Sequence, residues 1–67
     1  MKLTWQDADD IAGDLIEHYP ETDPLTVDLG RLQTMVAGLP RFGDDPSAAT
    51  NRLLETIQGV WYDKFED

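Results

Sequence analysis

Hydrophobic residues recur at steps of three and four along three stretches of this chain, and that spacing places them on one face of a helix. The first stretch covers residues 5–19. Thr4 followed three residues later by Asp7 resembles a capping box in which aspartate replaces glutamate. Pro20 and Pro24 cannot continue a helix, so a rigid loop is predicted there. The apolar positions of this first helix are Trp5, Ala8, Ile11, Ala12, Leu15, Ile16 and Tyr19.

Two more helices are predicted after that loop. Residues 25–28 are partly β-branched, which fits either one extended turn or a minimal strand. A second helix follows with Leu29, Leu32, Met35, Val36 and Leu39 on its apolar face. Residues 40–46 are rich in Pro, Gly and Asp, which is typical of turns. A third helix is expected to begin between Ser47 and Thr50 and to bury Leu53, Leu54, Ile57, Val60, Trp61 and Phe65.

These patterns predict an all-α fold, a compact three-helix domain over residues 1–67. The length leaves room for one small core and for no second domain. The chain has no cysteine, which excludes disulfides, thiolate metal sites and cysteine nucleophiles. The residues expected in the core are Trp5, Leu15, Leu32, Leu54, Ile57 and Trp61.

The net charge is the strongest signal in the composition. It is −9, from 14 acidic and 5 basic residues. Nucleic-acid binding depends on Lys and Arg that neutralise phosphates, so we expect no nucleic-acid partner. The chain is 40% hydrophobic, with those residues in a periodic pattern, so we expect a folded domain rather than disorder. With no apolar run near the roughly 20 residues of a membrane span, we expect a soluble, cytoplasmic protein without a membrane partner.

Four carboxylates share one face of the first predicted helix, and we call Asp7, Asp10, Asp14 and Glu17 the acidic ridge. At roughly 100° per residue they fall within about 80° of arc, opposite the apolar stripe. No Lys or Arg lies within residues 5–19. Neighbouring like charges on a helix cost a few tenths of a kcal/mol per pair. An unpaired ridge therefore indicates a basic protein surface or a hard metal ion, with a merely solvated face as the alternative.

Two residues could in principle carry catalytic chemistry. His18 is the only histidine and lies near the end of the first helix, where a structural role is expected. Ser47 is the only serine, and no G-x-S-x-G turn surrounds it, so helix capping is expected instead. The sequence around Ser47 also lacks the Asp-Ser-Leu motif at which acyl carrier proteins attach their prosthetic group. We therefore expect that the protein is not an enzyme.

Several short blocks occur at spacings that match a known family. They are Trp5-x-Asp7, Tyr19-Pro20, Asp23-Pro24-x-Thr26-Val27, Phe42-x-Asp44-Asp45-Pro46, Leu54-Glu55-x-Ile57 and Trp61-x-Asp63. Together they resemble the IscX (YfhJ) family of small acidic proteins linked to iron–sulfur cluster assembly. The resemblance covers nearly the whole chain without gaps.

The resemblance implies a fold and a function beyond what the residues indicate alone. IscX-like proteins have a helical fold described as a modified winged helix. They bind a basic patch of a cysteine desulfurase through an acidic surface, in competition with bacterial frataxin or ferredoxin. They act as rate modulators or iron adaptors, bind Fe²⁺ or Fe³⁺ weakly and hold no tight cofactor. We also expect a monomer.

The resemblance assigns the partner and metal sites to particular residues. Asp7, Asp10 and Glu17 match family carboxylate positions, and Asp14 is expected to replace an acid common at Gly13. This acidic ridge is the predicted docking and iron site. Arg31, Gly38, Pro40 and Arg41 stand where acids are common in the family. Secondary partner-binding candidates are Asp44, Asp45 and Glu55.

A rival function stays open beside the family resemblance. An acidic DNA-mimic or anti-repressor module would use the same charge to compete with DNA for a basic groove. The sequence does not decide between activation and inhibition of cluster assembly.

Overall fold

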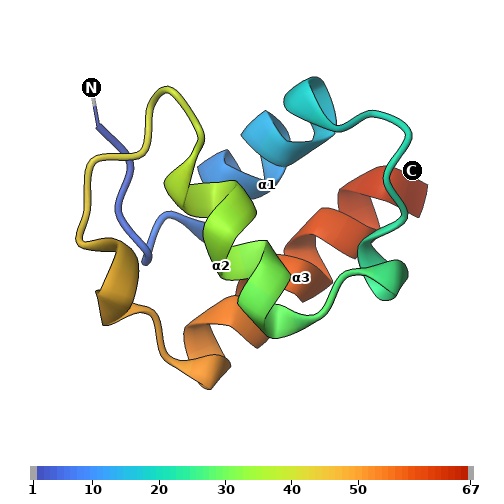
Figure 1. The fold of residues 1–67 in the computed structure, drawn as a ribbon. Helices are drawn as coiled ribbons and strands as arrows, with labels where there is room; N and C mark the ends of the chain where they lie inside the picture. The colour runs from blue at the N-terminus through green and yellow to red at the C-terminus, as the bar shows by residue number, and fades with distance from the viewer. Residues whose placement is uncertain (1, 67) are drawn as a thin grey trace.

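The computed structural model describes residues 2–66, and within that range it contains three α-helices, two short 3₁₀ turns and no strand. The elements are α1 (Ala8–His18), η1 (Pro24–Thr26), α2 (Leu29–Ala37), η2 (Pro46–Ala48) and α3 (Asn51–Glu66) (Figure 1). One isolated parallel bridge joins Leu3 to Phe42. The predicted all-α fold is confirmed, whereas the winged-helix-like detail stays a prediction.

The first helix begins at Ala8, three residues later than the hydrophobic pattern predicts. Residues 4–7 form a separate turn, in which the Asp7 N–H donates to the Thr4 carbonyl at 3.0 Å. The Asp7 carboxylate accepts the Thr4 N–H at 2.9 Å, the bond expected of a capping box. The turn leaves Trp5 outside the helix, where its side chain still reaches the core.

Residues 24–26 form a turn and not a strand. The Asp23 side chain accepts the Leu25 N–H at 3.0 Å, and Pro24 starts the turn with its fixed backbone angle. Gln58 of α3 donates its side-chain N–H groups to the carbonyls of Pro24 at 2.9 Å and Val27 at 2.8 Å. These two bonds attach the α1–α2 connection to α3.

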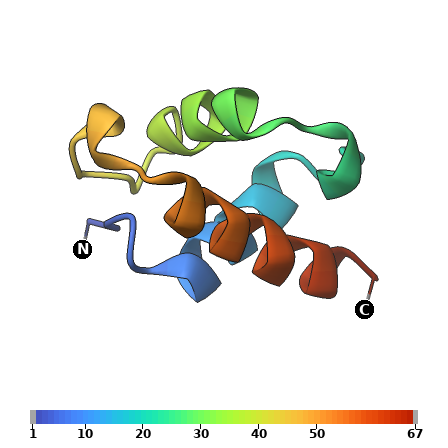
Figure 2. The same cartoon turned by 90° about the horizontal axis from the view of Figure 1, so that it is seen from below.

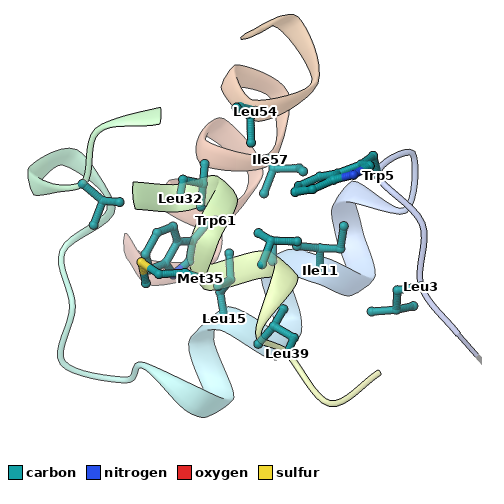
Figure 3. Packing of buried hydrophobic residues seen from close by; sticks show 13 residues of the cluster. Leu3, Trp5, Ile11, Leu15, Leu32, Met35, Leu39, Leu54, Ile57 and Trp61 are labelled. Carbon is teal, nitrogen blue, oxygen red and sulfur yellow. The ribbon is translucent and has the colours of Figure 1, made fainter. Parts of the chain in front are cut away.

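The three helices enclose one core. α1 and α3 make the most extensive contact, and α2 lies across one side of this pair (Figures 1 and 2). Figure 3 shows side chains from all three helices and from the N-terminal segment meeting in a single cluster. All six predicted core residues are buried, so that prediction is confirmed. The buried hydrophobic residues are Leu3, Trp5, Ile11, Ala12, Leu15, Val27, Leu32, Met35, Val36, Leu39, Leu54, Ile57 and Trp61.

The loop over residues 40–46 is held against the N-terminal segment. The Leu3 N–H donates to the Arg41 carbonyl at 2.7 Å, and the Gly43 N–H donates to the Leu3 carbonyl at 2.9 Å. The Trp5 indole N–H donates to the Asp45 carbonyl at 2.6 Å. The Trp5 and Phe42 rings meet edge to face with centroids 4.6 Å apart. This packing sets the path of the loop beside the start of α1.

Candidate functional site

Asp14 of the acidic ridge is buried and paired, contrary to its predicted place on an exposed, unpaired face. Its residue surface is 6% exposed. Arg41 reaches it from the loop after α2, with Nη2 2.8 Å from Oδ1 and Nε 3.0 Å from Oδ2. This is the two-bond fork that guanidinium and carboxylate groups form. The prediction of an exposed, unpaired Asp14 is wrong because the loop, which is bonded to Leu3, brings a cation to a helix that has no Lys or Arg of its own. The part assigned to Asp14 in partner and metal binding stays a prediction.

Arg41 is also electrostatically linked to the rest of the ridge. Its hydrogen bonds hold the pKa of the Asp14 carboxyl below its usual value, while burial acts in the opposite direction. The pKa of Arg41 is raised by its hydrogen bond to Asp14, by the charge of Asp14, and further by the charges of Asp10 and Glu17. Asp14 is therefore the ridge carboxylate that binds the guanidinium group, and Asp10 and Glu17 act on it only through their charge.

The remaining ridge residues have different surroundings. Asp7 is half-buried, and its carboxylate accepts the Thr4 N–H at 2.9 Å and the Thr4 hydroxyl at 3.3 Å. Asp10 and Glu17 are exposed, and their side chains have no hydrogen bond or ion pair with residues 2–66. They are seven residues apart, which is roughly 10.5 Å along the helix axis.

These positions do not bring the four carboxylates to one point. Among the described residues there is no group of three or more His, Asp or Glu side chains that could hold a metal ion. Asp14 is occupied by Arg41, and Asp7 shapes a turn. The ridge therefore offers two separate exposed carboxylates, Asp10 and Glu17, on either side of a bound guanidinium group.

The secondary candidates divide in the same way into structural and exposed groups. The Asp44 carboxylate accepts the backbone N–H groups of Trp5 at 3.2 Å and of Asp45 at 2.7 Å. The Asp45 carboxylate accepts the Ser47 N–H at 3.0 Å and the Ser47 hydroxyl at 2.8 Å, and both bonds lower its pKa. Glu55 is exposed on α3. Only Glu55 of these three is left without such a structural bond in the described part of the chain.

Ser47 does not cap the third helix. It lies within η2, whereas α3 begins at Asn51 and the Thr50 hydroxyl accepts the Leu53 N–H at 3.2 Å. A hollow of about 340 Å³ lies beside η2. It is lined by Thr4, Trp5, Gln6, Asp44, Ala48 and Leu53.

The residue that sequence reasoning missed is Arg41. Arg41 stands where acids are common in the family, and its contact with Asp14 of α1 joins residues 27 positions apart. The charge pattern along the helix holds no signal for that contact.

Within residues 2–66, no helix is long and apolar enough to cross a membrane.

Comparison with known proteins adds the family. The model of a family described as iron-sulphur cluster assembly matches residues 3–66. A Pseudomonas aeruginosa protein, described only as uncharacterized protein PA3808, is 41% identical over 64 residues, which is 96% of this chain and 97% of that protein. Because the family model matches nearly the whole chain, the chain belongs to the iron-sulphur cluster assembly family, which is the IscX (YfhJ) family.

Proposed function

We propose that this protein is a non-catalytic accessory factor of iron–sulfur cluster assembly that docks onto a basic surface of a cysteine desulfurase. Membership of the family supports the role in cluster assembly. The observation that carries the docking proposal is the pair of exposed carboxylates on α1, Asp10 and Glu17, which have no partner among residues 2–66, in a chain of net charge −9. Docking modulates the rate of assembly and competes with frataxin or ferredoxin for the same surface.

Electrostatic attraction accounts for how such a small protein finds its partner. A surface of one dominant sign raises the association rate with an oppositely charged surface. Exposed charges are screened beyond about 8 Å at physiological ionic strength, so the interaction weakens as salt rises. Asp10 and Glu17 make the direct contacts, and Glu55 adds to the field from α3. Asp14, Asp44 and Asp45 contribute indirectly, because they hold the loop and the N-terminal turn in place.

Iron enters this proposal only as a weakly bound, exchangeable ion. The four carboxylates of the acidic ridge do not fit a chelating site, because Asp7 and Asp14 already have partners and Asp10 and Glu17 are far apart along the helix. A hard cation on a convex helix surface has few simultaneous oxygen ligands. We therefore propose Fe²⁺ contact at single exposed carboxylates, with no tightly bound cofactor.

The proposal is tested by reversing charges on α1 without disturbing the fold. Asp10→Lys/Glu17→Lys is compared with Glu21→Lys/Asp63→Lys, which makes the same change in net charge at exposed positions off α1. Titration calorimetry with the purified desulfurase, at several salt concentrations, should show at least about a tenfold loss of affinity for the first variant and a smaller loss for the second. Equal losses would mean that net charge alone matters. A parent protein that does not bind would remove the desulfurase from the proposal.

A further inference from the structure

Arg41 has donors to spare beyond its bonds to Asp14. A guanidinium group carries five N–H groups in a rigid planar fork. Nε and Nη2 donate to the two Asp14 oxygens, at 3.0 and 2.8 Å. The Arg41 side chain is 51% exposed, so the outer edge of the group faces solvent. Its remaining N–H groups can donate to a second carboxylate from outside the molecule.

The guanidinium is also held in one position. The Asp14 carboxylate that binds the guanidinium group is buried, and the loop that contains Arg41 is bonded through its backbone to Leu3. A charged side chain that is already ordered loses little conformational entropy when it binds a partner. Arg41 is therefore pre-organised for contact, unlike a free surface lysine or arginine.

The charges on either side of Arg41 are negative. Asp10 and Glu17 are separated by two helical turns, which returns them to nearly the same face of α1, and Asp14 lies between them in the sequence. Both add to the negative potential at Arg41. Because Arg41 is bonded to Asp14, its guanidinium group lies between Asp10 and Glu17 along the axis of α1, and we call these three residues the Asp10–Arg41–Glu17 strip.

We propose that this Asp10–Arg41–Glu17 strip selects its partner by charge order, binding a protein surface that carries an acidic side chain between two basic ones. A uniformly acidic ridge would attract any cation along its length, whereas Arg41 neutralises Asp14 at the centre of the strip and presents N–H donors there, to which a carboxylate and not a basic residue can bind. The inference rests on the proposed function, since it describes the matching surface of the desulfurase. It adds Arg41, a positively charged contact residue, to a docking site that is otherwise acidic.

Recognition by net charge alone and recognition by charge order predict opposite changes in affinity when Arg41 loses its charge. Arg41→Gln removes a positive charge and takes the net charge from −9 to −10. If only net charge matters, this variant should bind the basic partner more tightly. If the strip matters, it should bind about 5- to 20-fold more weakly, because the partner's central carboxylate loses its guanidinium. Arg52→Gln, at an exposed position at the start of α3, makes the same charge change as a matched control and should not weaken binding.

A second variant separates recognition from folding. Arg41→Gln leaves the buried Asp14 carboxylate without its ion pair, so Asp14→Asn/Arg41→Gln is measured beside it; this double variant keeps the net charge at −9. If charge order matters, the single and the double variant should lose the same affinity for the desulfurase in titration calorimetry. Circular dichroism checks that each variant is folded. Unchanged or tighter binding by the folded double variant would overturn the charge-order inference and leave the docking proposal standing. A parent that fails to bind the desulfurase would remove both.

Discussion

Removal of the Arg41 side-chain charge should measurably destabilise the protein. Taking one partner from a fully buried ion pair costs about 3–5 kcal/mol, whereas a fully exposed pair contributes roughly 0.2–1 kcal/mol. Asp14 is 6% exposed, but its partner Arg41 has a side chain 51% exposed, so water reaches one side of the pair. We expect a value between the two cases, about 2 kcal/mol for Arg41→Gln at pH 7. For a domain of this size that is a fall in Tm of about 10 °C.

The loss of stability caused by Arg41→Gln should depend on pH and should become smaller as pH falls. Arg41 holds the folded-state pKa of Asp14 below its usual value, so the pair's contribution is complete above the unfolded pKa of about 3.9 and is lost as pH falls through the lowered folded value. In Arg41→Gln the two causes that are left are burial, which raises the pKa of the Asp14 carboxyl, and the smaller effect of the His18 charge, which lowers it. The variant's Asp14 therefore takes up a proton at higher pH than the parent's. The difference in stability between the two proteins should shrink as pH falls from 7 to 4.

A double-mutant cycle makes this measurable. Urea denaturation of the parent, Asp14→Asn, Arg41→Gln and the double variant can be followed by the fluorescence of the buried Trp5 and Trp61. Comparing variants at each pH removes the general effect of acid on a chain of net charge −9. We expect a coupling free energy of about 1–2 kcal/mol at pH 7. Coupling below about 0.3 kcal/mol, or a penalty that stays constant between pH 4 and 7, would refute the role assigned to the pair.

Three further predictions follow from the core, the turn and the exposed carboxylates. Trp61→Ala should cost about 3–5 kcal/mol, enough to unfold much of this small domain, and an unchanged circular dichroism melting curve would contradict it. Gln58→Ala should cost about 1–3 kcal/mol and speed hydrogen exchange at Val27; unchanged exchange there would mean that the turn does not depend on α3. Fe²⁺ should bind at roughly tens of micromolar or weaker and broaden NMR signals near Asp10 and Glu17 first. Broadening centred on His18 would place the ion elsewhere.

The helices and the core could be predicted because burial imposes a regular period on the sequence. Leu15, Leu32 and Ile57 are fully buried where the three- and four-residue spacing places them. The residue at which α1 starts could not be predicted, because the apolar stripe includes Trp5 while the backbone at residues 4–7 forms its own turn. The stripe reports which side chains reach the core and does not report the backbone conformation that carries them there.

The structural role of Asp14 could not be predicted, and the reason lies in how few cations the chain has. A helical wheel gives the direction of a side chain from its own helix but not which loop covers that direction. With 14 acidic and 5 basic residues, carboxylates occur on most surfaces, so their positions alone distinguish no site. The basic residues decide where the negative surface is interrupted. Lys64 comes within only 3.9 Å of an exposed Asp9 carboxylate, a contact worth little in water. Arg41 forms two short bonds to a buried carboxylate, and so it places a positive charge on the acidic face of α1.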